Sequence, residues 1–345
     1  MHDTCPSKIV DSQPIMILNP AARLPSAQRV VVVMATYNGA RFIEAQIRSI
    51  QAQSYAHWVL YIRDDGSRDE TVQKILHLAA HDQRIQLVQN GLGNQGVVGN
   101  FSMLLEFAAQ READYVFLAD QDDVWYPDKL AIMLANMQDL EQNYLATTPL
   151  LVHCDLAIVD SALQPVANSF VIYSGLYPAT AHLGVLLSQN QITGCASLIN
   201  RALLKLACPL PKSLRMHDWW LALLAAAAGK IAYIPQPLVQ YRQHAGSVVG
   251  AVSLMRRFVN FIKDWHHYLE VVRRSLLQAE MLEARLLTRG IQLPDLVKRQ
   301  LHTFTHILNR SPLNRARQLR KQQIGMHLAI PRWVFIVLIT IIKKT

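Results

Sequence analysis

The residues best suited to chemistry in this chain follow an apolar segment that begins at Phe117. The sequence there reads Phe-Leu-Ala-Asp-Gln-Asp-Asp-Val-Trp-Tyr-Pro-Asp-Lys. Asp120, Asp122 and Asp123 would repel one another at the end of a buried strand unless a divalent cation neutralised them. Carboxylate oxygens in this number suit Mg2+ or Mn2+, and both ions bridge protein carboxylates to a substrate diphosphate. The segment therefore predicts a metal site with Asp122 and Asp123 as ligands and Asp120 turned toward a ribose or the ion, a solvated acidic loop being the alternative.

A second group of candidate residues is His217-Asp218-Trp219-Trp220. Deprotonating an acceptor hydroxyl requires a carboxylate or imidazole within hydrogen-bond reach, so Asp218 is the candidate general base. A carboxylate at a helix start can instead cap the helix. Trp219 and Trp220 could supply an apolar platform for a sugar, with Trp125 and His217 completing the predicted acceptor site, although aromatic pairs more often belong to a core.

Two further polar residues occur in the sequence Tyr241-Arg-Gln-His244. Arg242 or His244 could bind a diphosphate or complete the metal shell, because a guanidinium suits phosphate oxygens and a neutral imidazole suits metals. A surface salt bridge is the alternative for both residues. We predict a nucleotide-binding role for Arg242 and a metal-binding role for His244.

Polar residues also stand at the ends of three predicted strands. Asp64 and Asp65 follow one strand, where a carboxylate can accept hydrogen bonds from a base or ribose, or can cap the next helix. Asn38 belongs to a turn dipeptide, Asn38-Gly39, and Asn94 to another turn, so both could instead serve only a tight connection or a helix start.

Four apolar segments are predicted to be the strands that position these residues. Their lack of polar alternation is typical of strands that are covered on both faces in a parallel sheet. The segments are Val30–Met34, Trp58–Ile62, Ile85–Val88 and Tyr115–Ala119. Apolar residues at helical spacing separate them, which predicts an open, mostly parallel α/β sheet flanked by helices, with its ligand site at the carboxyl ends of the strands.

Two shorter patterns predict where helices begin. Ser67, with Glu70 three residues later, has the spacing of a capping box. Pro127 suits the first position of a helix, where its missing N–H costs nothing.

The chain divides into a leader (1–28), an α/β domain (29–250) and a basic helical region (251–345) with a long helix over 254–287. The hydrophobic content of 51% is ample for a core. The last part holds 17 of the 34 Lys and Arg but 5 of the 25 acids, so the excess of positive charge belongs there. Nucleic acid and an anionic membrane surface are the two classes of partner that this charge suits.

The membrane is favoured because the chain ends in an apolar run, Trp333 to Ile342, followed by Lys343 and Lys344. The run has about half of the roughly 20 residues needed to span a bilayer, so it is expected to associate without crossing, a buried terminal helix being the alternative. No secretory signal is visible, and the four cysteines form no CxxC pair, so we expect thiols and a cytoplasmic location at the inner face of the membrane.

Five motifs, taken in order, resemble those of family 2 glycosyltransferases of GT-A fold, and bacterial rhamnosyltransferases most closely. The motifs are Ala35-Thr-Tyr-Asn-Gly39, Asp64-Asp65-Gly66-Ser67, Asp120-Gln-Asp-Asp123, His217-Asp218-Trp219-Trp220 and Tyr241-Arg-Gln-His244. The resemblance covers about residues 29–250. It implies inverting transfer from a nucleotide sugar, dTDP-rhamnose by closest likeness, to a glycan or lipid-linked oligosaccharide of a surface polysaccharide.

The resemblance also implies roles for single residues. Thr36, Tyr37, Asp65 and Asn94 would line the nucleotide pocket. Asp122 would hold the metal, and Asp218 would deprotonate the acceptor.

Other functions have less support in the sequence. The chain has no GxxxxGK[ST] or GxGxxG motif, so a P-loop or dinucleotide site is not indicated. It has no QxxRW motif, which the resemblance would require of a processive synthase. A sugar-phosphate nucleotidyltransferase would need a Gly-rich loop after the first strand, and a non-catalytic membrane-bound assembly factor would have no reason to keep both Asp122 and Asp218.

Overall fold

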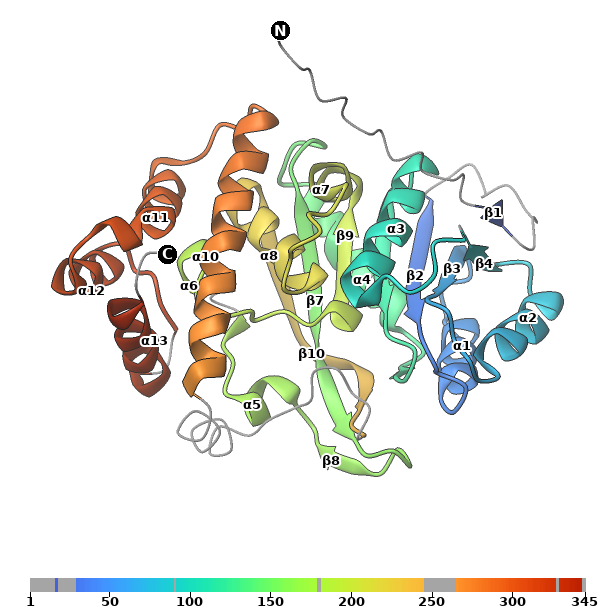
Figure 1. The fold of residues 1–345 in the computed structure, drawn as a ribbon. Coiled ribbons are helices and arrows are strands. Elements are labelled where there is room, and N and C mark those ends of the chain that lie inside the picture. Colours follow the sequence, from blue (N-terminus) through green and yellow to red (C-terminus); the bar gives the residue numbers. More distant parts are fainter. Residues whose placement is uncertain are drawn as a thin grey trace, which may run out of the picture.

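One mixed sheet forms the centre of the computed structural model, which describes residues 16–17, 29–89, 91–178, 181–244, 265–326 and 329–342. The four predicted strands are confirmed as β2 (Val30–Thr36), β3 (Trp58–Asp64), β4 (Ile85–Gln89) and β5 (Tyr115–Ala119). They are parallel, with β2 between β3 and β5. Figure 1 shows them in the half of the molecule that also carries α1 and α2.

The second half of the sheet departs from the predicted parallel arrangement. Its strands are β6 (Val124–Trp125), β7 (Leu150–Val159), β8 (Pro165–Ala167), β9 (Ser197–Asn200) and β10 (Lys230–Arg242). The strand order is β1-β4-β3-β2-β5-β9-β7-β10-β6, with β8 paired to β7 and with β1 covering Met16–Ile17. β9 is antiparallel to both β5 and β7, so the sheet is mixed, but β7 and β10 still run in the direction of β2 and β5.

Alternate side chains of the central strand enter two separate cores. Val30, Val32 and Met34 pack on the side of α1 (Ile43–Gln51), α2 (Thr71–His81) and α4 (Lys129–Glu141). Val31 and Val33 pack on the side of α3 (Gly96–Gln110), α7 (Arg201–Ala207) and α8 (His217–Ala228). Because successive strand residues point to opposite faces, this apolar strand requires helices on both sides and so produces three layers.

Neither of the two predicted helix starts is correct. α2 begins at Thr71, and Ser67 makes no helix cap, since its hydroxyl donates to Asp64 and accepts from the N–H of Asn38. α4 begins at Lys129, two residues after Pro127. Ser67 instead connects Asp64 to the Asn38 turn at the carboxyl edge of the sheet, and the carbonyl of Pro127 accepts the N–H of Ser54.

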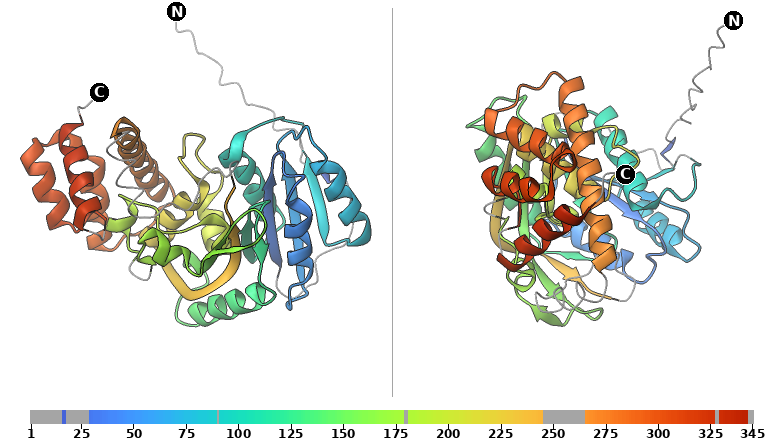
Figure 2. Two further views of the ribbon diagram at one scale, coloured as in Figure 1. Left: turned by 90° about the horizontal axis from the view of Figure 1, so that it is seen from below. Right: turned by 60° about the vertical axis from the view of Figure 1, so that its left-hand side comes forward.

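The helical character predicted for the C-terminal region is confirmed. Its elements are α10 (Trp265–Thr288), α11 (Asp295–Thr305), η3 (Ile307–Asn309), α12 (Pro312–Lys321) and α13 (Ala329–Ile341). Residues 254–264 of the predicted long helix lie outside the described residues, as do both domain boundaries, which stay predictions. In the views of Figures 1 and 2, α10 lies between the sheet and the other three helices.

α13 packs one face against the protein. Phe335, Ile336, Leu338 and Ile339 are at most 4% exposed. The buried guanidinium of Arg315 donates to the carbonyls of Ile339 (2.9 Å) and Ile342 (2.7 Å), which lack helical partners at the end of the helix. Among the described residues no helix has both the length and the apolar composition to cross a membrane.

Gly229 provides a test of how closely β10 approaches the start of β7. A β-carbon at this position would lie 1.7 Å from the carbonyl oxygen of Pro149, which accepts the N–H of Lys230. We expect Gly229→Ala to lower the free energy of unfolding by about 3 kcal/mol, because two backbone segments must separate. Gly290→Ala, at a positive φ in open space, is the control and should cost about 1 kcal/mol. Equal losses in urea unfolding would contradict this account.

Candidate functional site

The predicted acidic cluster lies at the carboxyl edge of the sheet, between β5 and β6. Asp123 is fully buried, and its Oδ1 accepts the N–H of Arg242 at 3.1 Å. Its Oδ2 has no hydrogen-bond partner in the described part of the chain. Asp122 Oδ2 lies 2.8 Å from Nε2 of His244. Residues about 120 positions apart in the sequence therefore meet here because β10 pairs with β6.

The electrostatics of the cluster favour a bound cation. The pKa of Asp120 is raised well above its usual value, first by burial and then by the neighbouring carboxylates of Asp123 and Asp122. Burial and Asp122 raise the pKa of Asp123 to about 7. A divalent cation would lower both of these raised pKa values, since it stabilises the charged form of each carboxyl.

The donor atoms also fit a cation. Carboxylate oxygens of Asp120 and Asp123 and the thiol of Cys195 lie within 4.8 Å of one another. Burial raises the pKa of Cys195 well above its usual value, so its thiol stays neutral and adds no charge. The carboxylate oxygens of Asp120 and Asp123 suit Mg2+ or Mn2+. Asp122, which pairs with His244, is not a member of this group, so the predicted metal-binding roles of Asp122 and His244 stay predictions.

Asp218 lies on the other side of the same site. It stands in the first turn of α8, and its Oδ2 accepts the N–H of Gly194 at 3.1 Å. Burial raises the pKa of Asp218 to about 6, although the hydrogen bonds from the N–H groups of Trp219 and Gly194 act to lower it. Because the charge of Asp218 also contributes to the raised pKa of Asp120, the two carboxyls act on one another. The structure thus places the predicted base near enough to Asp120 for the two carboxyls to interact, and its role as a base stays a prediction.

A short turn connects Asp218 to the acidic cluster, and no pattern in its residues indicates this role. The turn is η2 (Gly194–Ala196). Gly194 contacts Asp218, Cys195 contributes its thiol to the acidic cluster, and the carbonyl of Cys195 accepts the fully buried Lys129 Nζ at 2.6 Å. The desolvation of Lys129 lowers its pKa to about 8. Lys129 therefore places a positive charge under the carboxylates and fixes the turn between them.

Three residues that are predicted to contact the nucleotide form hydrogen bonds within the loops at this edge of the sheet. Asp64 accepts from the hydroxyls of Thr36 and Ser67 and is 9% exposed. Asp65 is 2% exposed, pairs with Arg63 at 2.7 Å and accepts the N–H groups of Gln95 and Gly96. The side chains of Thr36, Asp64 and Asp65 are buried and hydrogen-bonded within the protein, so they position these loops, and their predicted contacts with a base or ribose stay predictions.

Three of the predicted nucleotide contacts on this edge, Tyr37, Asn38 and Asn94, are exposed. Gln121, which was not predicted, holds the first loop, since it accepts the N–H of Tyr37 and donates to its carbonyl. A β-carbon on Gly39 would lie 2.2 Å from Gln121 Oε1, which explains a glycine there. These three exposed residues remain candidates for nucleotide binding.

The predicted acceptor platform is wrong, because its aromatic rings lie in the core. Trp219 and Trp220 are 3% and 0% exposed, and their indole N–H groups donate to the carbonyls of Leu186 and Ala207. Trp125 is 3% exposed with Lys129 Nζ 3.3 Å from its ring centroid. His217 stacks on Phe101 at 3.8 Å, and burial lowers its pKa to about 3. None of these side chains offers a face to a sugar.

Arg242 is likewise anchored within the protein. Its guanidinium donates to the carbonyls of Asp122 and Ser161 at 2.7 Å each. It also lies 4.6 Å from the ring centroid of Phe42, and the Phe42 ring is 4.8 Å from that of His244. This guanidinium holds the loop of Asp122 against β10, and its predicted nucleotide contact stays a prediction.

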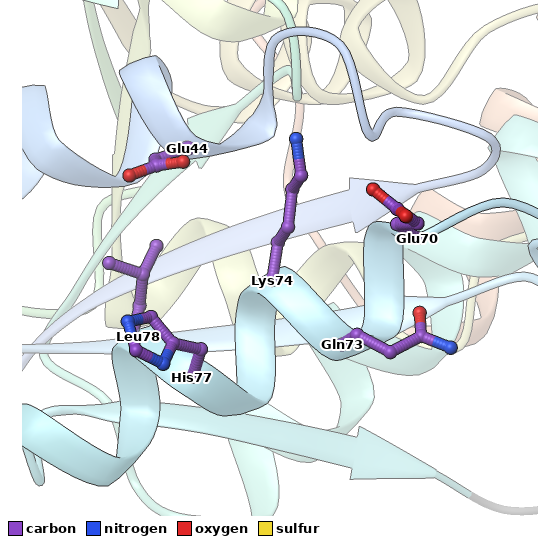
Figure 3. A pocket seen from close by; sticks show the side chains of 6 residues that line it. All are labelled: Glu44, Glu70, Gln73, Lys74, His77 and Leu78. Carbon is purple, nitrogen blue, oxygen red and sulfur yellow. The ribbon is translucent and has the colours of Figure 1, made fainter.

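A shallow pocket elsewhere on the surface is separate from this site. It lies between α1 and α2 (Figure 3) and is lined by Glu44, Glu70, Gln73, Lys74, His77 and Leu78. Lys74 donates to the carbonyl of Ala40, and Glu44 pairs with Arg48 on its own helix. Lys74 and Glu44 are thus engaged within the protein, and the pocket has no group of carboxylates like that at the carboxyl edge of the sheet.

Comparison with known proteins confirms the resemblance. Residues 31–158 match the family model described as glycosyl transferase family 2. The chain is 28% identical over 225 residues to the dTDP-rhamnosyl transferase RfbG of Shigella flexneri, covering 63% of this chain and 74% of that one. It is 34% identical over 108 residues to the UDP-Glc:alpha-D-GlcNAc-diphosphoundecaprenol beta-1,3-glucosyltransferase WfgD of Escherichia coli, covering 31% of this chain and 40% of the relative.

Solved structures show the same fold. The S. aureus TarS fragment 1–349 in complex with UDP has a TM-score of 0.52 at 17% identity, over 83% of this chain and 74% of that one. The mannosyltransferase PcManGT from Pyrobaculum calidifontis, in complex with GDP-Man and Mn2+, has a TM-score of 0.50 at 18% identity, over 88% of this chain and 75% of that one. The predicted GT-A fold is confirmed.

The raised pKa of Asp218 predicts a dependence of stability on pH. Because the folded pKa of about 6 exceeds the ordinary 3.8, the folded protein binds this proton more tightly. The stability from this group is complete below pH 4 and is lost as the pH rises through about 6. We expect Asp218→Asn to be more stable than the wild type at pH 7, by up to about 3 kcal/mol, and the difference to shrink at pH 4.

Urea unfolding at the two pH values measures this difference. Asp128→Asn, the same change at an exposed carboxyl, is the control and should show no such dependence. A variant at Asp218 that is less stable than the wild type at pH 7 would contradict the assignment.

Proposed function

We propose that this chain, whose residues 31–158 match family 2 glycosyltransferases, moves a sugar from a nucleotide-sugar donor to a hydroxyl of a glycan acceptor. The observation that carries the proposal is the placement of Asp218, a buried carboxyl with a raised pKa, beside the acidic cluster that would hold the donor diphosphate through a metal. A base facing a leaving-group site is the arrangement that a single displacement needs.

The residues of the chain would divide the reaction between them. Asp218 accepts the proton of the acceptor hydroxyl as that oxygen attacks the anomeric carbon. Asp120, Asp122 and Asp123, with His244, would hold Mg2+ or Mn2+, which would stabilise the charge on the departing diphosphate. The N–H of Gly194 and the amide of Asn190 hold the carboxylate of Asp218 in place. A single attack from the face opposite the diphosphate inverts the anomeric configuration.

The donor proposed is dTDP-rhamnose, which would give an α linkage from a β-linked donor. Support comes from the match of 225 residues with the rhamnosyl transferase, which extends well beyond the family segment. Exposed Tyr37, Asn38 and Asn94 are the proposed nucleotide contacts on the opposite side of the metal site.

The acceptor proposed is a glycan or lipid-linked oligosaccharide of a bacterial surface polysaccharide, elongated at the cytoplasmic face of the membrane. The name of the glucosyltransferase relative includes an undecaprenol-linked acceptor, in keeping with such a substrate. Nucleic acid is not proposed as a partner.

Two substitutions separate the base from the metal ligands. Asp218→Asn is expected to lower the turnover number by about 10^2-fold to 10^4-fold while donor binding is kept, because only proton transfer is lost. Asp122→Ala is expected to lose metal-dependent donor binding. Asp128→Ala, which removes an exposed carboxyl near the cluster, is the control and should behave as the wild type. Turnover by Asp218→Asn at the wild-type rate would exclude Asp218 as the base.

A screen of nucleotide sugars tests the donor. With the purified chain and Mg2+ or Mn2+, we expect hydrolysis or transfer of dTDP-rhamnose to exceed that of UDP-glucose, UDP-N-acetylglucosamine and GDP-mannose, and chelation to abolish it. Release of nucleoside diphosphate measures the reaction. Preference for another nucleotide sugar would replace the proposed donor and keep the transferase, whereas no activity on any donor would count against both.

A further inference from the structure

The last three helices form a strongly basic end of the molecule. After Asp295 the sequence has ten Lys and Arg residues and no Asp or Glu. Helices α11, α12 and α13 lie at the end of the molecule opposite α1 and α2 (Figures 1 and 2). The positive charge of the chain is therefore concentrated on one side of the fold, away from the half that carries the nucleotide edge.

α13 has a second apolar face that the protein does not cover. Trp333, Val337 and Ile341 are 58%, 50% and 51% exposed. They are spaced by four residues, so they lie one above the other along the same side of the helix. Their neighbours Phe335 and Ile339 are 1% and 0% exposed, which means that the helix is apolar on both its inner and its outer side.

Exposed cations lie beside this stripe. Arg317, Arg320 and Lys321 are exposed and share one side of α12 by their spacing. The guanidinium of Arg320 stands 4.6 Å from the ring centroid of Trp333, so the cationic side of α12 borders the apolar stripe of α13. We call these six residues the α12–α13 face. Arg315 does not contribute to it, because its guanidinium is buried at the end of α13.

We propose that the α12–α13 face binds the surface of a membrane that contains anionic lipids. Its apolar stripe, with a tryptophan at one end, matches the boundary between acyl chains and headgroups, where indole rings are enriched. Its cations match anionic headgroups. A second copy of the chain fits the face poorly because like charges would meet, and nucleic acid would leave the apolar stripe uncovered.

The packing of α13 limits how deeply the helix enters the membrane. Its inner residues form part of the main core, and Arg315 fixes its end, so the helix cannot leave the protein without exposing that core. The helix therefore lies in the plane of the interface with its outer stripe inserted. Deleting α13 would remove core and docking surface together, so substitutions on its outer side are the informative change.

The experiment measures binding of the full-length chain to vesicles by cosedimentation. We expect it to bind vesicles that contain phosphatidylglycerol more tightly than vesicles of phosphatidylcholine alone. Each charge near an anionic surface changes binding about fivefold. Arg317→Gln with Lys321→Gln should therefore lower binding about 30-fold, and Trp333→Glu with Val337→Glu should lower it by at least as much. Leu145→Glu, at a leucine 78% exposed between α4 and β7, is the matched control and should bind as the wild type.

Thermal unfolding of each variant checks that the exposed substitutions leave the fold intact. Vesicle binding unchanged by both double variants, or lost equally in Leu145→Glu, would overturn the proposal. Self-association of the wild type that Trp333→Glu with Val337→Glu abolishes, without vesicle binding, would identify a second copy as the partner instead. The inference deepens the proposed function by stating where it takes place, but the assay contains no donor, so its failure leaves the proposed transfer untouched.

Discussion

The mutual repulsion of four carboxylates at one edge of a buried sheet is the constraint on which the site depends. Burial raises the pKa values of Asp120, Asp123 and Asp218, and neighbouring carboxylates raise those of Asp120 and Asp123 further. The buried cations Lys129 and Arg242 and several backbone N–H groups partly offset this negative charge. The remaining excess of negative charge is what the proposed metal ion would neutralise.

The strands and the acidic cluster could be predicted because each leaves a local pattern. Val30–Met34 has no polar residue, so it indicates a strand covered on both faces, and the structure places α1 and α3 on its two sides. The acidic segment directly follows a strand of the same kind. The antiparallel β9 could not be predicted, since its four residues carry no alternation that differs from that of a short buried helix segment.

The errors at the site share one physical cause. Residue type alone predicts ligand contacts for Trp219 and Trp220, but an indole ring packs in a core as readily as it packs against a substrate. Residue type also gives no indication of Lys129 or Cys195. A lysine side chain usually lies in solvent, and a lone cysteine has no partner at a spacing typical of a metal site. Only the pairing of strands distant in sequence shows that these two residues lie beneath the carboxylates.

The buried hydrogen bonds of Asp64 and Asp65 have a consequence for how such a protein can change over time. They fix the backbone of the loops that carry Tyr37, Asn38 and Asn94, while those three side chains themselves project outward. Replacing an exposed side chain on a rigid loop costs little stability. A substitution of the exposed Tyr37 side chain can therefore change this edge without disturbing the backbone beneath it, whereas Asn38, which has a φ of 47° and accepts the N–H of Arg68, is part of what holds the loops.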